Sequence, residues 1–466
     1  MKVVGRKGAA FTAVWMATAA GFFCIQSRPV VDRKSFDRAL ETPPATRPFM
    51  QDGIDFFENR LRARKGNDDL ARSRLVGLYM GRFKISGSLP DLDTARKHLD
   101  SLLRHDSSDE RLYIKLSALD LSEHRFSPAL EAAQKAVDLS GSGSDSHDAA
   151  ALALFDALFA IGRYGEASRQ LGGNLMDSGS AAALTRKVRM DAWSGKTALA
   201  EAELEAACKD ALAGASAPSV LAWCAVELAD YADRAGKPRK AMARYREALV
   251  LVPGYPPALE GMGRLAYGRD HNLHMAKVLW EKALRYGGHL SIYMDLLKIE
   301  KDSGNIAESL KLKSRFIQAA TASPTLERMY FRSLAMAELD YSERRPEALR
   351  YALLDNENRQ TVESYDVLAW AYFRDGSIIN AFHASKKALE LSARDPSVLY
   401  RAALISWHAG NRTQADTLMQ SAVKAAEAIQ KNGGSVSGFP PALSALGNDF
   451  GRALSSKDLL AFHTHD

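Results

Sequence analysis

A period of thirty-four residues constrains this chain more than any other feature of its sequence. Three small residues recur when the sequence is shifted by that distance: Gly376, Ala381 and Ala388 become Gly410, Ala415 and Ala422. A fixed period of this length is typical of stacked helix pairs, because small residues are needed where helices touch and glycine where the chain turns. The spacing therefore predicts an all-α solenoid.

The composition is that of a folded, almost entirely helical chain. Its 466 residues exceed the usual size of one globular core, but a solenoid has no such limit because each repeat contacts mainly its neighbours. The formal net charge of +6 includes Lys2, Arg6 and Lys7, and the other charges are mixed evenly along the helices. A nucleic-acid surface would show clustered Lys and Arg. We therefore expect no nucleic-acid partner.

The N-terminus has the pattern of an export signal or a membrane anchor. Three basic residues occur within residues 1–7, and residues 8–27 carry no charge. This pattern predicts a cleaved signal peptide, a lipoprotein signal with Cys24 as the lipidated residue, or an uncleaved membrane anchor over residues 1–27. Residues 28–48 contain four prolines and no helical period, which predicts a flexible tether. Each alternative places the repeats at the cell envelope, outside the cytoplasm, on the periplasmic side and associated with a membrane.

The clearest repeat unit begins near Ala222 and ends at Pro253. Its first helix carries Leu228 and Ala229, Gly236 forms the turn, and small and aromatic residues line the second helix: Ala241, Tyr245 and Ala248. This order of residues resembles the tetratricopeptide repeat, as found in exported or membrane-anchored bacterial proteins of that family. The resemblance implies a right-handed α-solenoid of helix hairpins whose first helices line a concave groove.

The repeats are expected to fill most of the chain. About ten units are visible between residues 66 and 430, and the solenoid domain is predicted to span residues 49–430. Residues 431–466 begin with glycine, serine and proline and continue with apolar residues at helical spacing: Leu443, Leu446, Phe450 and Leu454. This segment is predicted to be a linker followed by a capping helix that covers the last repeat.

The resemblance also indicates which residues of the C-terminal repeats would contact a partner in the concave groove. The predicted binding residues are Asp366, Trp370, Phe373, Arg374, Tyr400, Arg401, Leu404, Trp407 and His408. Aromatic side chains and arginine are the commonest anchors at protein interfaces. The alternative is that the aromatic residues belong to the core. In the preceding units, polar residues occupy comparable positions: Trp223, Asp230, Asp233, Arg264, Tyr267, Lys298 and Lys301.

The cysteines allow one further structural prediction. Cys208 and Cys224 lie at equal distances from the connection near Ser216, so antiparallel packing of their helices can bring them together. Within about 7 Å between Cα atoms they can form a disulfide, and otherwise they are free thiols in a helix interface.

No catalytic arrangement is visible in the sequence. The eleven histidines have no metal-ligand spacing except His463 and His465 at the terminus, so no metal site and no cofactor are expected. The sequence therefore predicts a non-enzymatic protein-interaction scaffold that binds a protein or peptide segment of an envelope assembly. The alternative is an envelope receptor for a small ligand such as a sugar or peptide. The sequence makes no prediction of oligomeric state.

Overall fold

The computed structural model describes residues 33–42, 50–141, 144–172, 175, 180–213, 218–341, 344–391 and 394–431. In this part of the chain every regular element is an α-helix. Two helices precede the repeats, α1 (Arg33–Glu41) and α2 (Gln51–Ala63).

Ten helix hairpins follow along the described chain, in agreement with the predicted number of repeats. They are α3 (Asp69–Ser86) with α4 (Leu89–His105), α5 (Glu110–Ser122) with α6 (Phe126–Leu139), α7 (Asp145–Ala160) with α8 (Tyr164–Gln170), α10 (Ala181–Trp193) with α11 (Thr197–Ala213), α12 (Pro218–Arg234) with α13 (Pro238–Leu251), α14 (Pro256–Gly268) with α15 (Leu273–Arg285), α16 (Ile292–Asp302) with α17 (Ile306–Ala320), α19 (Phe331–Tyr341) with α20 (Arg345–Asn358), α21 (Val362–Arg374) with α22 (Ile378–Glu390), and α23 (Pro396–His408) with α24 (Arg412–Lys431). The short helix α18 (Pro324–Met329) precedes α19 and was not expected from the sequence.

The residues that define the repeat have the structural roles that the spacing predicts. Gly236 turns the chain between α12 and α13 with a φ of 70°, a left-handed conformation that other residues adopt only with strain. Ala241, Tyr245 and Ala248 of α13 have no exposed surface. They fill the space between the two helices of the unit and the next first helix.

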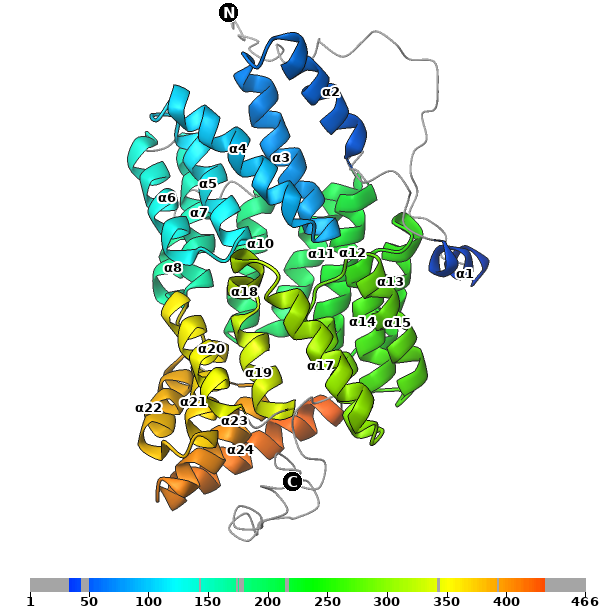
Figure 1. Cartoon of the computed structure of the whole chain (residues 1–466), viewed down its shortest axis with the longest axis vertical. Helices are drawn as coiled ribbons and strands as arrows, with labels where there is room; N and C mark the ends of the chain where they lie inside the picture. Colours follow the sequence, from blue (N-terminus) through cyan, green and yellow to red (C-terminus); the bar gives the residue numbers. More distant parts are fainter. Residues whose placement is uncertain are drawn as a thin grey trace, which may run out of the picture.

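The solenoid curves toward its first helices. Neighbouring first helices, such as α12 and α14 or α21 and α23, pack against each other more extensively than neighbouring second helices do. The first helices therefore form the inner, concave side and the second helices the outer side (Figure 1). Side chains on the free face of the first helices point into this interior.

The winding is tight enough for one superhelical turn to rest on the next. The backbone N–H of Gln360 donates to the carbonyl of Ile161 at 3.1 Å, and the Asn358 amide donates to the His124 carbonyl at 2.9 Å. The Arg328 guanidinium donates to the Glu123 carbonyl at 3.0 Å, and Arg394 donates to the Ser194 carbonyl. We call this set of contacts the seam. Figure 1 shows it as the yellow segment from α18 to α20 lying beside the cyan and teal helices.

The N-terminal region differs from the sequence prediction. Helix α1 lies within residues 28–48, which were predicted to be a tether without helical structure. Ala39 is buried against α13, and Phe36 and Leu40 contact the same cluster. The prediction was wrong for this stretch because one turn of apolar residues among many charges is too short to register as a helical period. The predicted signal or anchor (residues 1–27, with Cys24) and capping helix (within 431–466) lie outside the described residues.

Candidate functional site

The aromatic wall predicted in the C-terminal repeats belongs to the core. Trp370 is 1% exposed and Tyr400 is 0% exposed, and Phe373 and Leu404 are also buried in the same cluster. Trp370 stacks on Phe373 with 5.2 Å between ring centroids. These four side chains fill the contact between α21, α23 and their neighbours, so they lack the exposure that a surface anchor needs. This burial corrects the predicted groove and favours the core alternative.

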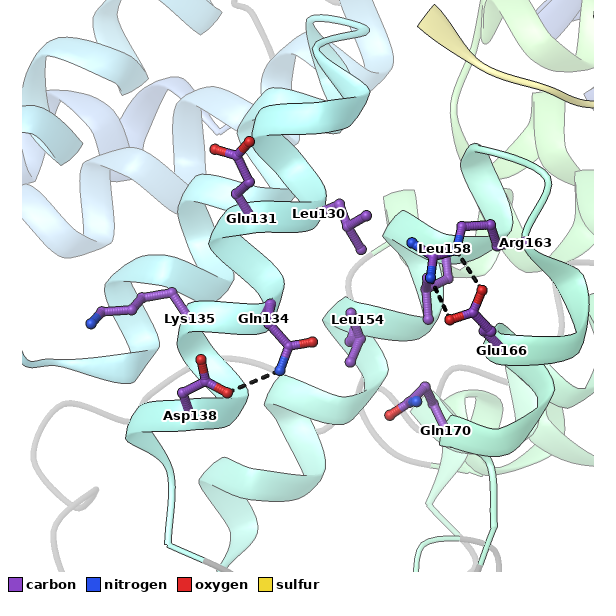
Figure 2. A pocket seen from close by; sticks show the side chains of 10 residues that line it. All are labelled: Leu130, Glu131, Gln134, Lys135, Asp138, Leu154, Leu158, Arg163, Glu166 and Gln170. Atoms are coloured by element: carbon purple, nitrogen blue, oxygen red, sulfur yellow. Dashed lines mark hydrogen bonds and ion pairs between the residues drawn. The ribbon is translucent and has the colours of Figure 1, made fainter.

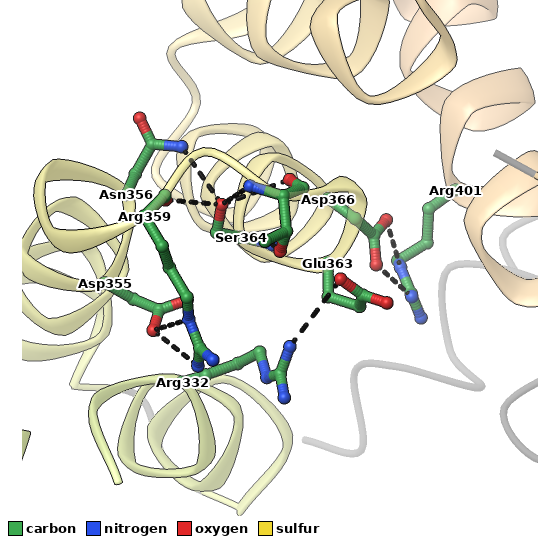
Figure 3. Close-up of polar contacts among 9 residues, drawn as sticks. Arg332, Asp355, Asn356, Arg359, Glu363, Ser364, Asp366 and Arg401 are labelled. Atoms are coloured by element: carbon green, nitrogen blue, oxygen red, sulfur yellow. Dashed lines mark hydrogen bonds and ion pairs between the residues drawn. The ribbon is translucent and has the colours of Figure 1, made fainter. Parts of the chain in front are cut away.

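The remaining predicted residues form internal contacts or lie near the surface. Arg401 donates two hydrogen bonds to the Asp366 carboxylate, one of them at 3.0 Å, and thereby joins α23 to α21 (Figure 3). Trp407 is half-buried, and the Arg412 guanidinium lies 3.6 Å from the centre of its indole. His408 is exposed. Partner binding through Trp407 and His408 stays a prediction.

A continuous row of charged and aromatic side chains lines the first helices of the middle repeats. We call this row the inner strip. It consists of Asp230 and Asp233 on α12, Glu260, Arg264 and Tyr267 on α14, Asp295, Lys298, Lys301 and Asp302 on α16, Asp340 on α19, and Arg374 on α21. Six of these residues are positions that the sequence indicated for the middle groove.

Ion pairs and hydrogen bonds connect neighbouring helices along the inner strip. Arg264 contacts Asp230 at 2.7 Å and Glu260 at 3.0 Å. The Tyr267 hydroxyl donates to Asp302 on the next helix, and the Lys298 ammonium lies 5.2 Å from the centre of the Tyr267 ring. The positive field of Lys298 also reaches Asp295 and Asp340. The row is therefore one electrostatically coupled surface.

Three carboxyl groups in the inner strip make no ion pair or hydrogen bond with the rest of the described chain. They belong to Asp233, Asp295 and Asp340. Burial, and then the nearby charge of Glu260, raise the pKa of Asp295 to about 7. Burial also raises the pKa values of Asp233 and Asp340, although positive side chains nearby oppose the shift. An unpaired carboxyl group in such surroundings is costly when ionised.

Arg374 provides a cation with unused hydrogen-bonding capacity in the same region. Its Nη1 atom is buried and has no hydrogen-bond partner. Burial lowers the pKa of Arg374, while Asp340 nearby acts in the opposite direction. Sequence reasoning had assigned Arg374 to the C-terminal groove and had missed Asp295 and Asp340. The repeat period could have located Asp340, because it lies one repeat length before Arg374.

A second polar group lies beside the seam. Arg359 donates two hydrogen bonds to Asp355, at 3.0 and 2.9 Å, while Arg332 reaches Glu363 only at 3.9 Å (Figure 3). Burial, and then the charge of Arg359, lower the pKa of Arg332. Burial also lowers the pKa of His124 to about 3, so this histidine is neutral at physiological pH. The Arg359 guanidinium also lies 5.3 Å from the centre of the Phe126 ring, across the seam.

An open groove lies between α6, α7 and α8 on another part of the molecule (Figure 2). It has a volume of about 470 Å³. Leu130, Leu154 and Leu158 line its floor, and charged residues form its rim. Arg163 pairs with Glu166 across the rim, and Gln134 donates to Asp138 at 2.9 Å. These four polar groups are paired with each other, while Glu131, Lys135 and Gln170 also line the groove.

Three further observations bear on chemistry and location. Cys208 of α11 and Cys224 of α12 form a disulfide, with their Cα atoms 5.9 Å apart. Within the described ranges, the His, Cys, Asp and Glu side chains form no group of three suited to holding a metal ion. No helix in the same ranges combines the length and apolar character needed to cross a bilayer.

Comparisons with known proteins find distant structural similarities. No protein-family model and no curated protein matches the chain. A subunit of the APC/C hetero-tetramer Cut9–Hcn1 is similar over 79% of this chain and 64% of its own, at 16% identity and a TM-score of 0.42. Human IFIT1, in a dimer with PPP-AAAA, is similar over 84% of this chain and 93% of its own, at 14% identity and a TM-score of 0.41. A tetratricopeptide repeat protein from Parabacteroides merdae is similar over 54% of this chain and 96% of its own, at 17% identity and a TM-score of 0.34.

These similarities are too distant to identify a partner or an activity. The architecture itself rests on the geometry described above: ten consecutive hairpins, left-handed glycines at most of their turns, and the buried contacts of Ala241, Tyr245 and Ala248. The prediction of a tetratricopeptide-like α-solenoid is confirmed.

Proposed function

We propose that this chain is a non-enzymatic protein-interaction scaffold whose inner strip binds a segment of a protein partner. One observation carries the proposal: Asp295, Asp340 and Arg374 lie on three consecutive first helices, and each has polar atoms that the described chain leaves unpaired. Groups of this kind raise the free energy of the unbound protein. A partner that supplies hydrogen bonds and opposite charges lowers it again.

The inner strip favours a partner segment of mixed charge. It exposes carboxylates on α12 and α16, and cations on α16 and α21, within one coupled row. Complementary charges give orientation and selectivity, because a wrong register places like charges opposite each other. Many repeats provide a long surface, so modest contacts at each first helix add up along a bound segment.

The proposed location is the bacterial cell envelope, outside the cytoplasm and associated with a membrane through the N-terminus. The basic and then uncharged start of the sequence supports this location. The Cys208–Cys224 disulfide also supports it, since disulfides persist in oxidising compartments. The proposed partner belongs to an envelope assembly.

A pair of charge-neutralising substitutions tests the binding surface without weakening the fold. Asp295→Asn with Asp340→Asn keeps the shape of both side chains and removes two half-buried, unpaired charges. We expect the variant to be at least as stable as the natural protein. We also expect it to lose partners that crosslink to Lys298 or Lys301 in intact envelopes, as read by mass spectrometry.

The matched control replaces two exposed carboxylates on outer helices, Asp93→Asn with Glu427→Gln. It should retain all partners. An unchanged set of crosslinks in the inner-strip variant would show that the partner binds elsewhere. Equal losses in both variants would show a non-specific dependence on negative charge.

A further inference from the structure

The outer side of the middle repeats has a charge pattern that the whole-chain composition conceals. The three second helices α13, α15 and α17 carry ten Lys or Arg residues and three Glu residues. The first helices of the same units, α12, α14 and α16, carry four Lys or Arg residues and seven Asp or Glu residues. The charges are therefore not evenly mixed in space, contrary to the sequence expectation.

Part of this positive charge is neutralised inside the protein. Lys240 pairs with Glu201 at 2.7 Å, Lys277 with Glu300 at 2.6 Å, and Lys313 with Glu338 at 2.7 Å. Other basic side chains point outward and are exposed, with Glu281 as the one exposed acidic residue on these three helices. They are Arg239, Arg246, Arg285, Lys311 and Arg315. Lys311 also pairs with Glu308 at 3.3 Å on this face. The exposed face still carries an excess of positive charge after these pairs are discounted.

Large apolar side chains are exposed on the same helices. Met275 and Val278 on α15 are 42% and 44% exposed, and Ile306 and Leu310 on α17 are 70% and 51% exposed. We call these four residues, together with the five exposed basic residues, the outer basic face. Exposed apolar side chains next to basic ones are typical of surfaces that lie on anionic membranes, because both groups gain free energy there.

Helix α1 connects the outer basic face to the N-terminal segment of the chain. Phe36 of α1 lies under the Arg246 guanidinium, 4.8 Å from ring centre to cation, and Lys282 of α15 donates to the Leu40 carbonyl. Figure 1 shows α1 beside α13 and α15. Six residue steps separate Ser27, the end of the uncharged stretch, from Arg33 at the start of α1, a reach of roughly 20 Å. Lys34 and Arg38 on α1 are exposed as well.

We propose that the outer basic face, together with α1, docks on an anionic lipid bilayer. The basic side chains contact lipid headgroups, and Met275, Val278, Ile306 and Leu310 enter the headgroup layer. In this orientation the second helices face the membrane and the inner strip faces away from it. The short path from Ser27 to α1 brings the same face to any bilayer that holds residues 8–27.

Vesicle binding by the full-length chain tests the charge requirement. The probes are vesicles of phosphatidylcholine alone and of phosphatidylcholine mixed with phosphatidylglycerol. The ratio of the two partition coefficients removes the contribution that the uncharged N-terminal stretch makes to both. Each basic residue near an anionic surface contributes about fivefold, so Arg239→Glu, Arg285→Glu and Arg315→Glu together should lower the ratio by roughly a hundredfold. Added salt should lower the ratio for the natural protein.

The matched control reverses three exposed lysines on the outer helices of other repeats, Lys97→Glu, Lys135→Glu and Lys424→Glu. It has the same net charge as the test variant, and its ratio should stay close to that of the natural protein. A similar fall in both variants would overturn the proposal, because the effect would then come from net charge. A ratio close to one for the natural protein would also overturn it.

Oxidative footprinting of the bound protein locates the contact. Phosphatidylglycerol vesicles should slow oxidation of Met275 and Leu310 severalfold, while Ile379 on α22, which is 74% exposed, should react as in solution. Unprotected Met275 on bound protein would overturn the proposal. Equal protection by a short single-stranded RNA at the same salt concentration would also overturn it, because the face would then be a general polyanion site.

Discussion

Two glycines inside α14 allow aromatic side chains of the neighbouring second helices to approach its backbone. A Cβ atom on Gly261 would lie 2.2 Å from the Tyr245 ring, and one on Gly263 would lie 2.4 Å from Nε1 of Trp280. The Trp280 indole uses this space to donate a hydrogen bond to the Glu260 carbonyl at 3.1 Å. Glycine normally weakens a helix, so its presence here reflects a close contact rather than flexibility.

Gly263→Ala should therefore destabilise the protein, although alanine is the better helix former. We expect a loss of about 1–3 kcal/mol, because the new methyl group forces Trp280 out of its position. Gly77→Ala is the matched control: Gly77 lies in α3, and no atom stands within 4 Å of an added Cβ. That variant should gain about 0.5–1 kcal/mol. Urea unfolding measures both, and equal shifts would refute the close-contact explanation.

Asp295 should make stability depend on pH in a defined direction. Because burial raises its pKa to about 7, the folded protein holds a proton that the unfolded chain releases near the ordinary aspartate pKa of 3.8. Between these two pH values the folded state binds more protons, so stability falls as pH rises toward 7. Asp295→Asn should be more stable than the natural protein at pH 8, by about 1–2 kcal/mol after allowance for solvent screening.

This gain should disappear at about pH 3 and below, where Asp295 is largely protonated in both states. Urea unfolding of the two proteins across this pH range provides the comparison. A constant difference at all pH values would mean that the carboxyl group does not titrate as described.

At the residue scale, the sequence correctly predicted which positions define the repeat, but it did not predict which side chains are exposed to solvent. The repeat positions Ala241, Tyr245 and Ala248 were placed correctly, because contact between helices selects small and aromatic residues at fixed steps. Trp370 and Tyr400 were placed on a groove wall but are buried. Helical periodicity gives the face on which a residue lies, and the width of the contact between two first helices decides whether that face reaches solvent.

At the scale of elements, the hairpins could be predicted from local sequence patterns. Most of the features that the sequence did not predict lie in the connections between hairpins. The disulfide between α11 and α12 joins one repeat to the next across a connection near Ser216. Sequence symmetry around that connection allowed the disulfide and free thiols equally. Helix α1 and the added helix α18 were missed because each is under ten residues long and lies among charged or turn-forming residues.

Removing the disulfide should weaken this junction. A sequence separation of 16 residues corresponds to a loss of about 3 kcal/mol from constraint of the unfolded chain. Cys208→Ala with Cys224→Ala should lower the free energy of unfolding by about 2–4 kcal/mol. A reducing agent should destabilise the natural protein similarly in thermal unfolding and leave the double variant unchanged. An equal effect of the reducing agent on both would assign the change to a disulfide between two chains through Cys24.

At the scale of the whole molecule, the seam turns an open spiral into a compact body. Its hydrogen bonds join the turns at His124, Ile161 and Ser194 to segments roughly two hundred residues further along the chain. The thirty-four-residue period predicts stacking of neighbours but contains no information on contacts between superhelical turns. Those contacts use backbone carbonyls and single arginine or asparagine side chains, which leave no pattern in a sequence. The inner strip shows the same division. Its middle positions could be predicted from the period, whereas its unpaired groups could be identified only from the structure.

Gly162→Ala should break part of the seam. Gly162 has a φ of 87°, and an added Cβ would lie 2.1 Å from the Gln360 carbonyl oxygen. Gly376→Ala is the matched control, since Gly376 has a φ of 86° and open space around the added atom. In both variants, a Cβ at positive φ should lower the free energy of unfolding by about 1–2 kcal/mol. Gly162→Ala should lower it by about 1–3 kcal/mol more, because its Cβ also clashes with Gln360.

Small-angle X-ray scattering should show an increased radius of gyration for Gly162→Ala and no change for Gly376→Ala. Equal stability losses and identical radii would show that the two turns of the superhelix do not depend on each other.

The seam also limits how a gene for this protein can change in length. In an open repeat array each unit meets only its two neighbours, so whole repeats can be lost or duplicated without disturbing distant ones. In this protein, the number of hairpins between two seam turns decides which two turns face each other. Deleting a single hairpin between Ile161 and Gln360 would bring a different connection opposite every seam turn at once. We therefore expect related proteins to keep the same number of repeats, while the sequences of the individual helices diverge.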